Sequence, residues 1–445
     1  MQDVFDWIVI GSGPAGQRAA VQAAKLKKKV LIVERDDWGG ACVHKGTIPS
    51  KTLKEAALLN EARLENAWQK ILYRKERVLK NEAEIIARQL DRNGVTRVRG
   101  QASFVDTNAI RVGDALLRGS KFLVAVGTRP CRGPDFPWAI SDLYDSDTIL
   151  GMKESPESLL VIGAGVIGCE YASIFARLGV QVTLVDRRKE LLRSVDQEIV
   201  DRLKKHFEEA SIRMEIGADY KDVTTSAFGR GVEVEIGGQR QIFSAALVCM
   251  GRQGNIDSLG LEKIGVKASD RGIIPVNEKY QTSLSHIYAA GDVIGAPALA
   301  ASSSEQGRLA ARHAFEVDSP PFSKLFPYGI YTIPEISSVG AQESELVKDG
   351  VSYVVGRASY GELARGQILG DEHGLLKILV SRTDRKILGV HILGTGATEL
   401  VHIGQTAMHF EATVDFFVGN IFNYPTLAEA YKVASLNAQN QLQGS

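Results

Sequence analysis

The sequence predicts an α/β fold in which two similar parallel-sheet domains precede a C-terminal α+β domain. The first observation is a repeat, because WIVIGSGPAG and LLVIGAGVIG each join an apolar strand to a glycine-rich loop, a helix and a second strand. Gly163 follows Gly11 by 152 residues, and the rest of both segments keeps this register. The second observation is that strands such as LLKILVSR mix with helices such as ELVHIGQTAMHF after residue 318.

The composition is that of a globular protein with several domains. A chain of 445 residues holds two to four domains at about 100 to 200 residues each. Lys and Arg together number 53, as do Asp and Glu, so net charge gives no case for binding nucleic acid or an anionic membrane. The 44 glycines exceed the usual share and indicate close backbone contacts.

The cysteines and the apolar runs indicate a cytoplasmic protein. Cys42, Cys131, Cys169 and Cys249 are far apart and form no Cys-X-X-Cys pair, which argues against a disulfide scaffold or a zinc ribbon. The first residues lack the basic and apolar regions of a signal peptide. No apolar run approaches the roughly 18 residues of a membrane span.

Each glycine loop has the spacing Gly-X-Gly-X-X-Gly, and an acidic residue follows the third glycine by 18 positions. The glycines are Gly11, Gly13, Gly16, Gly163, Gly165 and Gly168, and the acids are Glu34 and Asp186. In this motif the glycines permit the tight turn, the approach of a pyrophosphate and the packing of helix on strand, while the acid accepts ribose hydroxyls. We therefore expect two Rossmann-like dinucleotide-binding domains. Glycine-rich turns in an ordinary parallel sheet are the alternative.

Other helices, strands and domain boundaries are predicted from hydrophobic spacing and from the positions of Pro and Gly. Residues 52–92 have helical spacing and no Pro or Gly, so they predict one or two long helices with a solvated charged face. Short strands are expected at 96–104 and 109–112, and a helix at 298–311. LGMKESPES near residue 150 and the Pro-Pro pair near 320 indicate domain boundaries.

Residues 39–51, GGACVHKGTIPSK, resemble the signature of the flavoprotein disulfide reductases, in which two cysteines separated by four residues precede Ile-Pro-Ser-Lys. Residues 288–293, YAAGDV, resemble that family's second flavin motif, and residues 124–130, VAVGTRP, resemble its interdomain segment. The resemblance spans Phe5 to about Asn437 and implies a glutathione-reductase-like fold. It divides the chain into an FAD-binding domain (1–147 and 268–318), an NAD(P)-binding domain (148–267) and a dimerisation domain (319–445).

Several stretches are similar to one branch of that family, the soluble (Si-specific) pyridine nucleotide transhydrogenases. They are YDSD at 144–147, GAGVIGCEYASIF at 163–175, GIYTIPEISSVG at 329–340 and FNYPT at 422–426. The branch implies FAD as cofactor, NAD(H) and NADP(H) as substrates, and reversible hydride transfer between them. It also implies a homodimer or a higher homo-oligomer, whose segment around Tyr424 and Glu429 reaches the partner's flavin.

Two departures from the disulfide reductases carry the functional expectation. Thr47 stands where the family has its second cysteine, so Cys42 has no thiol partner. Tyr424 stands where the family has a basic histidine, and a phenol with a pKa near 10 is a poor base at neutral pH. The absence of the second cysteine and of the histidine agrees with a reaction in which the flavin alone accepts and returns the hydride, without a disulfide. The alternatives are a dihydrolipoamide dehydrogenase-like or diaphorase-type NAD(P)H oxidoreductase, and a nucleotide-binding protein without catalysis.

The resemblance places Lys51, Glu170 and Thr47 at the catalytic centre, with Lys51 and Glu170 paired beside the flavin. A purely structural ion pair is the alternative. Asp292 matches the residue that binds the ribityl chain. The expected cofactor-binding residues are Gly11, Gly13, Pro14, Ala15, Gly16, Glu34, Arg35, Asp36, Asp37, Trp38, Gly39, Gly40, Ala41, Cys42, Lys51, Ala102, Gly127, Gly163, Gly165, Val166, Ile167, Gly168, Asp186, Arg187, Arg188, Gly251, Gly291 and Asp292.

Selectivity between the nicotinamide nucleotides is expected at the end of the second repeat. Asp186 favours the free 2′-hydroxyl of NAD, whereas Arg187 and Arg188 can bind the 2′-phosphate of NADP. Replacing both arginines with alanine should weaken NADPH binding far more than NADH binding. Solvated strand-end charges are the alternative.

Some cysteine and histidine residues that could bind a ligand or react are expected to have a structural role or none. Cys42 is read as an inert buried thiol, with peroxide sensing as the alternative. His44 is read as a hydrogen-bonded structural residue, with contact to flavin or substrate as the alternative. His402 and His409 are seven residues apart with no third ligand indicated, so no metal site is expected.

Overall fold

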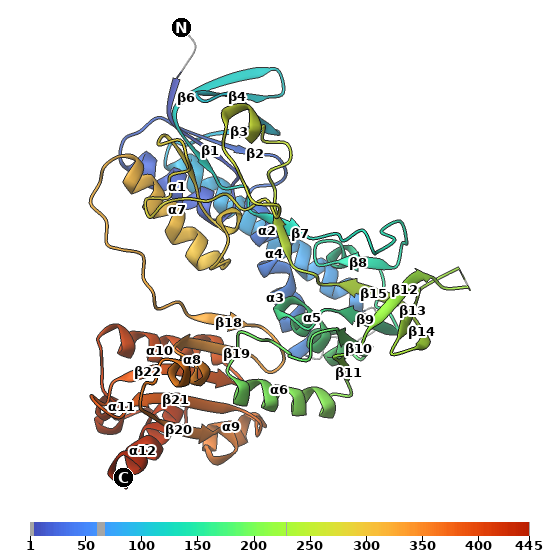
Figure 1. Ribbon diagram of the computed structural model, residues 1–445, viewed down its shortest axis with the longest axis vertical. Coiled ribbons are helices and arrows are strands. Elements are labelled where there is room, and N and C mark those ends of the chain that lie inside the picture. The colour runs from blue at the N-terminus through green and yellow to red at the C-terminus, as the bar shows by residue number, and fades with distance from the viewer. Residues whose placement is uncertain (1–3, 60–66, 228, 445) are drawn as a thin grey trace. The chain divides into compact units, whose positions relative to one another are not determined.

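The protein is described by a computed structural model that covers residues 4–59, 67–227 and 229–444 (Figure 1). The chain forms two compact units. Unit 1 comprises Met1–Trp138, Tyr144–Ser155 and Met250–Phe322, and unit 2 comprises Ala139–Leu143, Pro156–Cys249 and Ser323–Ser445. The predicted three-domain boundaries stay a prediction, while the predicted α/β fold is confirmed.

Unit 1 is built on a seven-stranded sheet with the order β3-β2-β1-β6-β5-β4, in which β17 also pairs with β6. Its strands are β1 (Val4–Ile10), β2 (Val30–Glu34), β3 (Thr96–Arg99), β4 (Ala102–Asp106), β5 (Ala109–Val112), β6 (Ala115–Val124) and β17 (Ile287–Ala289). The strands β3, β2, β1, β6 and β17 pair in parallel, whereas β4 and β5 form an antiparallel extension. The glycine loop follows the carboxyl end of β1, near the middle of this sheet.

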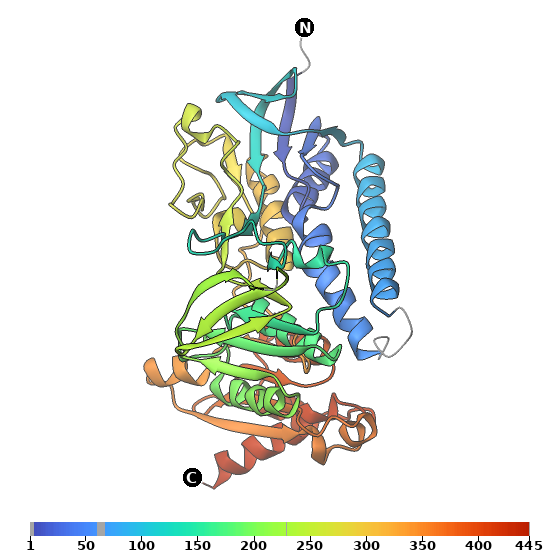
Figure 2. The ribbon, with the colours of Figure 1, turned by 90° about the vertical axis from the view of Figure 1, so that its right-hand side faces the viewer.

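Helices α1 (Pro14–Lys25) and α7 (Ala300–Ala314) pack closely together in unit 1 (Figure 1). They touch at Gly307, where a Cβ atom would collide with the carbonyl oxygen of Ala15. The predicted helical region 52–92 contains α3 (Thr47–Leu58) and α4 (Ala67–Arg92), and α4 is the long blue helix of Figure 2. Residues 60–66 lie outside the described residues. Helix α2 (Gly40–His44), strands β7 (Thr128–Pro130) and β16 (Arg252–Gly254) and short turns complete the unit.

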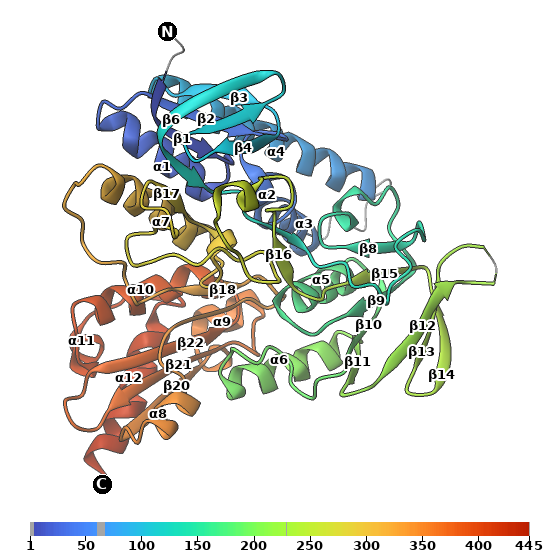
Figure 3. The same ribbon diagram turned by 45° about the horizontal axis from the view of Figure 1, so that its top comes forward.

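Unit 2 contains the second repeat, whose parallel strands lie in the order β11-β10-β9-β15. They are β9 (Ser158–Ile162), β10 (Gln181–Asp186), β11 (Arg213–Ile216) and β15 (Ala245–Val248), joined by α5 (Val166–Arg177) and α6 (Gln197–Glu209). A separate antiparallel sheet, β12 (Tyr220–Thr225), β13 (Val232–Ile236) and β14 (Gln239–Phe243), projects at the right of Figure 3.

The C-terminal part of unit 2 is a five-stranded antiparallel sheet with the order β18-β19-β22-β21-β20. The strands are β18 (Tyr328–Ile330), β19 (Ile336–Gly340), β20 (Tyr353–Ser359), β21 (Leu375–Ser381) and β22 (Ile387–Leu393). Its helices are α8 (Glu343–Lys348), α9 (Ala364–Leu369), α10 (Ala397–His409), α11 (Val414–Gly419) and α12 (Glu429–Gln443). Tyr360, Phe417 and Tyr431 are fully buried in the core between sheet and helices. Among the described helices, none combines the length and the apolar character that a membrane crossing needs.

Candidate functional site

The two glycine loops have the same backbone geometry in both units. Gly11 and Gly163 lie in the left-handed region with φ of 102° and 109°, and their N–H groups donate to the carbonyls of Val33 and Val185 at 2.8 Å. A Cβ atom on Gly16 would collide with the carbonyl oxygen of Gly11, and one on Gly168 with that of Gly163. Side chains are therefore excluded where the helix crosses the loop.

Among the described residues, no side chain caps the first turns of α1 and α5, so their backbone N–H groups, which Pro14 lacks, face the loops without a capping partner. Gly13 caps α1 and Gly165 caps α5, and neither helix has a side-chain cap hydrogen bond. A Cβ atom at either glycine would meet no atom within 4 Å, so the space beside both helix ends is open. Free N–H groups and the positive end of a helix dipole are what a pyrophosphate requires. Both loops fit a dinucleotide on this observation.

The two acids are buried carboxylates in equivalent places. Glu34 is 8% exposed and Asp186 is 6% exposed, at the ends of β2 and β10. Glu34 accepts the N–H of Ser12 at 2.8 Å, and Asp186 accepts the N–H of Ala164 at 2.8 Å. Ser12 and Ala164 are again 152 residues apart, so the repeat in the sequence is a repeat in the contacts. Glu34 also accepts the hydroxyl of Ser12 at 2.7 Å, and this hydroxyl accepts the N–H of Gly39 at 2.9 Å.

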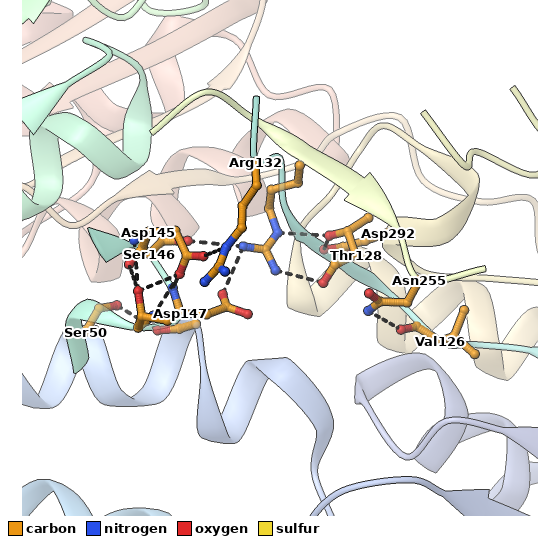
Figure 4. A network of polar contacts seen from close by, with 12 residues as sticks. Ser50, Val126, Thr128, Arg132, Asp145, Ser146, Asp147, Asn255 and Asp292 are labelled. Carbon is orange, nitrogen blue, oxygen red and sulfur yellow. Dashed lines mark hydrogen bonds and ion pairs between the residues drawn. The ribbon is translucent and has the colours of Figure 1, made fainter. Parts of the chain in front are cut away.

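Asp292, the predicted ribityl ligand, accepts hydrogen bonds from two hydroxyl groups, and Figure 4 shows it beside one of them, Thr128. Thr128 donates to its Oδ2 at 3.4 Å, and Ser303 donates to its Oδ1 at 3.3 Å. Arg252 donates to the Thr128 hydroxyl at 2.9 Å and to the Thr128 carbonyl at 2.8 Å. Because arginine is only a donor, the Thr128 oxygen accepts from it, and the single hydroxyl hydrogen is left for Asp292. Arg252 thus fixes the direction of that hydrogen.

A turn that carries the carboxylates of Asp145 and Asp147 lies beside this network, also within unit 1 (Figure 4). Asp145 accepts from Arg132 at 2.8 Å and from the N–H of Thr148 at 2.8 Å. Burial alone would raise its pKa, but these hydrogen bonds outweigh burial and hold the pKa of Asp145 below the ordinary value. Asp147 differs, because burial raises its pKa despite the opposing charge of Arg252. Asp145 and Asp147 lie in the YDSD stretch, to which no contact was assigned from the sequence, and Arg252 lies in no quoted motif.

Cys42 lies in α2 and Thr47 is the first residue of α3, and the Thr47 side chain is close enough to the Cys42 thiol to lower its pKa. Burial raises the pKa of the Cys42 thiol, and the hydrogen bond with Thr47 only partly opposes this effect. The raised pKa leaves the thiol protonated at neutral pH and a weak nucleophile, and Cys42 is partly buried, so its inert role stays a prediction. His44 places its Nε2 3.0 Å from the carbonyl oxygen of Trp38, in keeping with a structural histidine.

Lys51 lies in α3 of unit 1 and Glu170 in α5 of unit 2, so their pairing stays a prediction. Glu170 is 5% exposed and accepts the N–H of Tyr331 at 2.8 Å. Ser173, one turn later, accepts the N–H of Ile333 at 3.0 Å. These bonds fasten helix α5 to the segment after β18.

The other predicted residues lie close to the loops or at their flanks. Pro14 and Ala15 form the first turn of α1, and Val166 and Ile167 form that of α5. Arg35, Asp36, Asp37, Trp38, Gly39, Gly40 and Ala41 follow β2, while Ala102 begins β4. Gly127 precedes β7, Gly251 precedes β16 and Gly291 precedes Asp292. Four residues of the site were not predicted from the sequence. Ser12 and Thr128 lie inside quoted motifs, at positions to which the motif assigns no contact, while Ser303 and Arg252 lie outside any motif.

The arginines after Asp186 have different partners. Arg188 donates twice to Asp186, at 3.1 Å from Nε and 2.8 Å from Nη2. Burial alone would raise the pKa of Asp186, but the bonds from Arg188 and Ala164 hold it below its ordinary value, so the carboxylate is ionised at neutral pH. Arg187 donates to Asp219 at 2.7 Å and lies 4.3 Å from the ring centroid of Tyr220. Both arginines are thus held by partners, Arg188 by Asp186 and Arg187 by Asp219 and Tyr220.

The sequence predicts that Arg188 binds the 2′-phosphate of NADP. On that prediction, replacing Arg188 with alanine should raise KM for NADPH about tenfold or more, as expected for the loss of a charge-assisted bond. KM for NADH should change little, because NADH carries no charge at that position. Steady-state kinetics with each nucleotide measure the effect. Arg193→Ala is the matched control, since the Arg193 side chain is 83% exposed and pairs with Glu190. Equal increases in both KM values would contradict the assignment.

Comparisons with known proteins agree with this geometry. Residues 5–307 match the family described as pyridine nucleotide-disulphide oxidoreductase, and residues 326–435 match the dimerisation domain of that family. Proteins named soluble pyridine nucleotide transhydrogenase from Mycobacterium tuberculosis (strain ATCC 25177 / H37Ra) and from Yersinia enterocolitica are 45% and 42% identical. Each alignment covers 98% of this chain and 98% of the relative.

Solved structures with the same fold are flavoprotein disulfide reductases and a related protein. The HOCl-induced flavoprotein disulfide reductase RclA from Escherichia coli is 25% identical with a TM-score of 0.92, over 97% of this chain and 99% of that one. LpdA from Mycobacterium tuberculosis is 27% identical with a TM-score of 0.89, over 97% and 99% of the two chains. The resemblance seen in the sequence motifs is thereby confirmed, and the chain belongs to the pyridine nucleotide-disulphide oxidoreductase family.

Proposed function

We propose that the chain is an FAD-dependent pyridine nucleotide transhydrogenase of the Si-specific type, which transfers hydride reversibly between NADPH and NAD⁺. The observation that carries the proposal is the contact between Cys42 and Thr47, where a disulfide reductase needs a second thiol. The names of the relatives at 42% and 45% identity support it. Two dinucleotide loops with matching contacts supply one place for a flavin dinucleotide and one for a nicotinamide nucleotide.

FAD belongs to the first loop in this proposal. The α1 N–H groups beside Gly13 bind its pyrophosphate, Glu34 accepts its ribose hydroxyls, and Asp292 accepts hydroxyls of the ribityl chain. When bound, FAD supplies a ring that accepts hydride from one nicotinamide nucleotide and returns it to another. The hydrogen bonds from Thr128 and Ser303 orient the Asp292 side chain, so its remaining lone pairs can accept from hydroxyl donors.

The second loop takes the nicotinamide nucleotide. Its phosphates lie at the N-terminus of α5, and Asp186 or Arg188 meets the adenosine ribose according to whether it carries a 2′-phosphate. The chain needs no general acid or base for hydride transfer, because positioning and exclusion of water are sufficient. Lys51 and Glu170 then serve to place a positive charge near the flavin, and Thr47 fills the space of the absent thiol.

The proposal also includes a homodimer that works in the cytoplasm. The dimerisation match over residues 326–435 supports self-association. Large apolar side chains are exposed in this region: Phe410 at 76%, Phe416 at 49%, Ile421 at 96% and Tyr424 at 67%. An apolar surface of this kind is typical of a buried interface. Light scattering should give at least twice the chain mass of 48.3 kDa.

The decisive experiment is anaerobic transfer of hydride from NADPH to thio-NAD⁺ by the purified protein, with its visible spectrum recorded and oxidised lipoamide as a second acceptor. A flavin spectrum, rapid reduction of thio-NAD⁺ and no turnover of lipoamide are expected. Turnover of lipoamide would instead establish a dihydrolipoamide dehydrogenase-like enzyme. Flavin that is reduced without transfer would indicate a diaphorase with another acceptor, and a colourless protein would refute a flavoenzyme.

A further inference from the structure

Two histidines and a glutamate form a cluster in unit 2, apart from both glycine loops. His206 and Glu209 lie in the last turn of α6, three residues apart and hence on one face of the helix. His373 lies in the segment between α9 and β21. No local sequence pattern indicates this cluster, because His373 follows Glu209 by 164 residues.

The candidate ligand atoms of the three residues lie nearly close enough together to bind one metal ion. One candidate ligand atom from each residue lies within 4.8 Å of the other two. The Nε2 atom of His373 is 3.1 Å from Oε2 of Glu209, and the two imidazole rings lie 5.5 Å apart between centroids. Ligands at 2.0–2.1 Å from a tetrahedral ion are about 3.3 Å apart, so small side-chain rotations would complete the set. Nδ1 of His206 is buried and has no hydrogen-bond partner among the described residues.

The backbone around His373 is held by its neighbours. Asp371 accepts the N–H of Gly374 at 3.0 Å and the N–H of Thr395 at 2.6 Å, which fastens the segment on both sides of the imidazole. Arg202, one turn before His206 in α6, contacts the carbonyl of His373 at 3.5 Å. The ligands therefore come from a helix and an anchored loop. Such supports reduce the entropy that a metal ion must overcome.

We propose that His206, Glu209 and His373 form a Zn²⁺ site with its fourth position open to water. Two imidazoles and one carboxylate suit Zn²⁺, whereas Mg²⁺ and Ca²⁺ prefer oxygen ligands. The ion would join the end of α6 to the segment before β21 within unit 2. Its role is a structural clamp, because a ligand that binds only the folded chain stabilises that chain. The site is independent of the proposed hydride transfer.

The test uses the tag-free holoprotein, freed of metals with a chelator and titrated calorimetrically with Zn²⁺ at pH 7.5. One Zn²⁺ per chain and a Zn²⁺-dependent rise in Tm are expected, with no effect of Mg²⁺. Glu209→Gln and His373→Gln should each weaken Zn²⁺ binding by more than about tenfold and abolish the rise in Tm. Both side chains are about half exposed, at 56% and 45%, so their replacement leaves the core intact.

Glu208→Gln is the matched control, since Glu208 is exposed on the same turn and lies outside the cluster. It should bind Zn²⁺ as the parent does. The proposal is overturned if the parent binds no Zn²⁺. It is also overturned if both cluster variants bind as tightly as the parent, since the ion then sits elsewhere, for example on the cysteine thiols. Circular dichroism confirms that each variant is folded.

Discussion

Replacing Lys377 with methionine should lower the free energy of unfolding by about 3–5 kcal/mol, because it leaves the buried carboxylate of Asp196 and the partly buried carboxylate of Glu343 without this cation. The Lys377 side chain is 1% exposed in β21. Its Nζ contacts Asp196 at 2.9 Å, Glu198 at 3.2 Å and, more closely, Glu343. Asp196 caps α6 and Glu343 begins α8, so one ammonium group joins three elements. Urea denaturation at pH 7 measures the loss.

The control is Lys348→Met, an exposed lysine in the same helix as Glu343, which should change stability by about 0.5 kcal/mol or less. A second measurement uses pH. Burial opposes ionisation of Glu198 and Glu343, yet Lys377 and Arg357 hold the pKa of both below the ordinary 4.5. Groups with lowered pKa stabilise above 4.5 and lose that contribution as the pH falls through their folded values. The difference in the free energy of unfolding between the parent and Lys377→Met should therefore become smaller as the pH falls below 4.5. A loss below 1 kcal/mol at pH 7 would contradict the argument.

Replacing Thr47 with cysteine should create a disulfide with Cys42. The Cys42 thiol already contacts the Thr47 side chain, so the new thiol would start beside its partner. The structure has four free cysteines, so the reduced variant would have five thiols and the oxidised variant three, titrated in denaturant without reductant. Because burial raises the pKa of Cys42, oxidation should need mildly alkaline conditions. Each molecule that forms the disulfide loses two titratable thiols, and each molecule that does not form it loses none.

Ser50→Cys serves as the matched control, one turn further along α3, where Ser50 donates to the carbonyl of Gly46 at 2.9 Å. It should keep five titratable thiols. The Thr47→Cys variant should gain no turnover of lipoamide, because Tyr424 still supplies a phenol where a disulfide reductase has its histidine. If the Thr47→Cys variant still had five titratable thiols after treatment with oxidant, the proximity of residues 42 and 47 would be contradicted. Lipoamide turnover would show that a base other than residue 424 is sufficient.

The strands and helices of the repeats were predicted well because burial and local pattern agree there. The apolar run VLIVE coincides with β2, and the end of β10 coincides with Asp186. The helical pattern TLAEAYKVASLNAQNQL predicts a helix from Thr426, but α12 begins at Glu429, since Thr426 instead donates to the carbonyl of Asn423 at 2.7 Å in a turn. The hairpin of β13 and β14 was not predicted, although Gly237 and Gly238, both with positive φ, were a usable signal.

The candidate site was predictable where a motif carries it and hidden where single residues meet. Both loops and both acids followed from spacing alone, because backbone chemistry fixes them. Arg252 and Thr128 are 124 residues apart, so their contact depends on how β7 and β16 pair, which no local pattern specifies. The same reason hid Asp219, which lies 32 residues after Arg187.

The sheet of unit 1 has a consequence for how the chain is made. Its strand β6 ends beside β17, which the ribosome synthesises more than 160 residues later. Until Gly307 has emerged, α1 also lacks the helix that packs against Ala15. The nascent chain must therefore carry an unpaired strand edge through synthesis of the whole second repeat, and such edges invite pairing with other chains. Premature termination before residue 287 should yield fragments that aggregate, however well their second repeat folds.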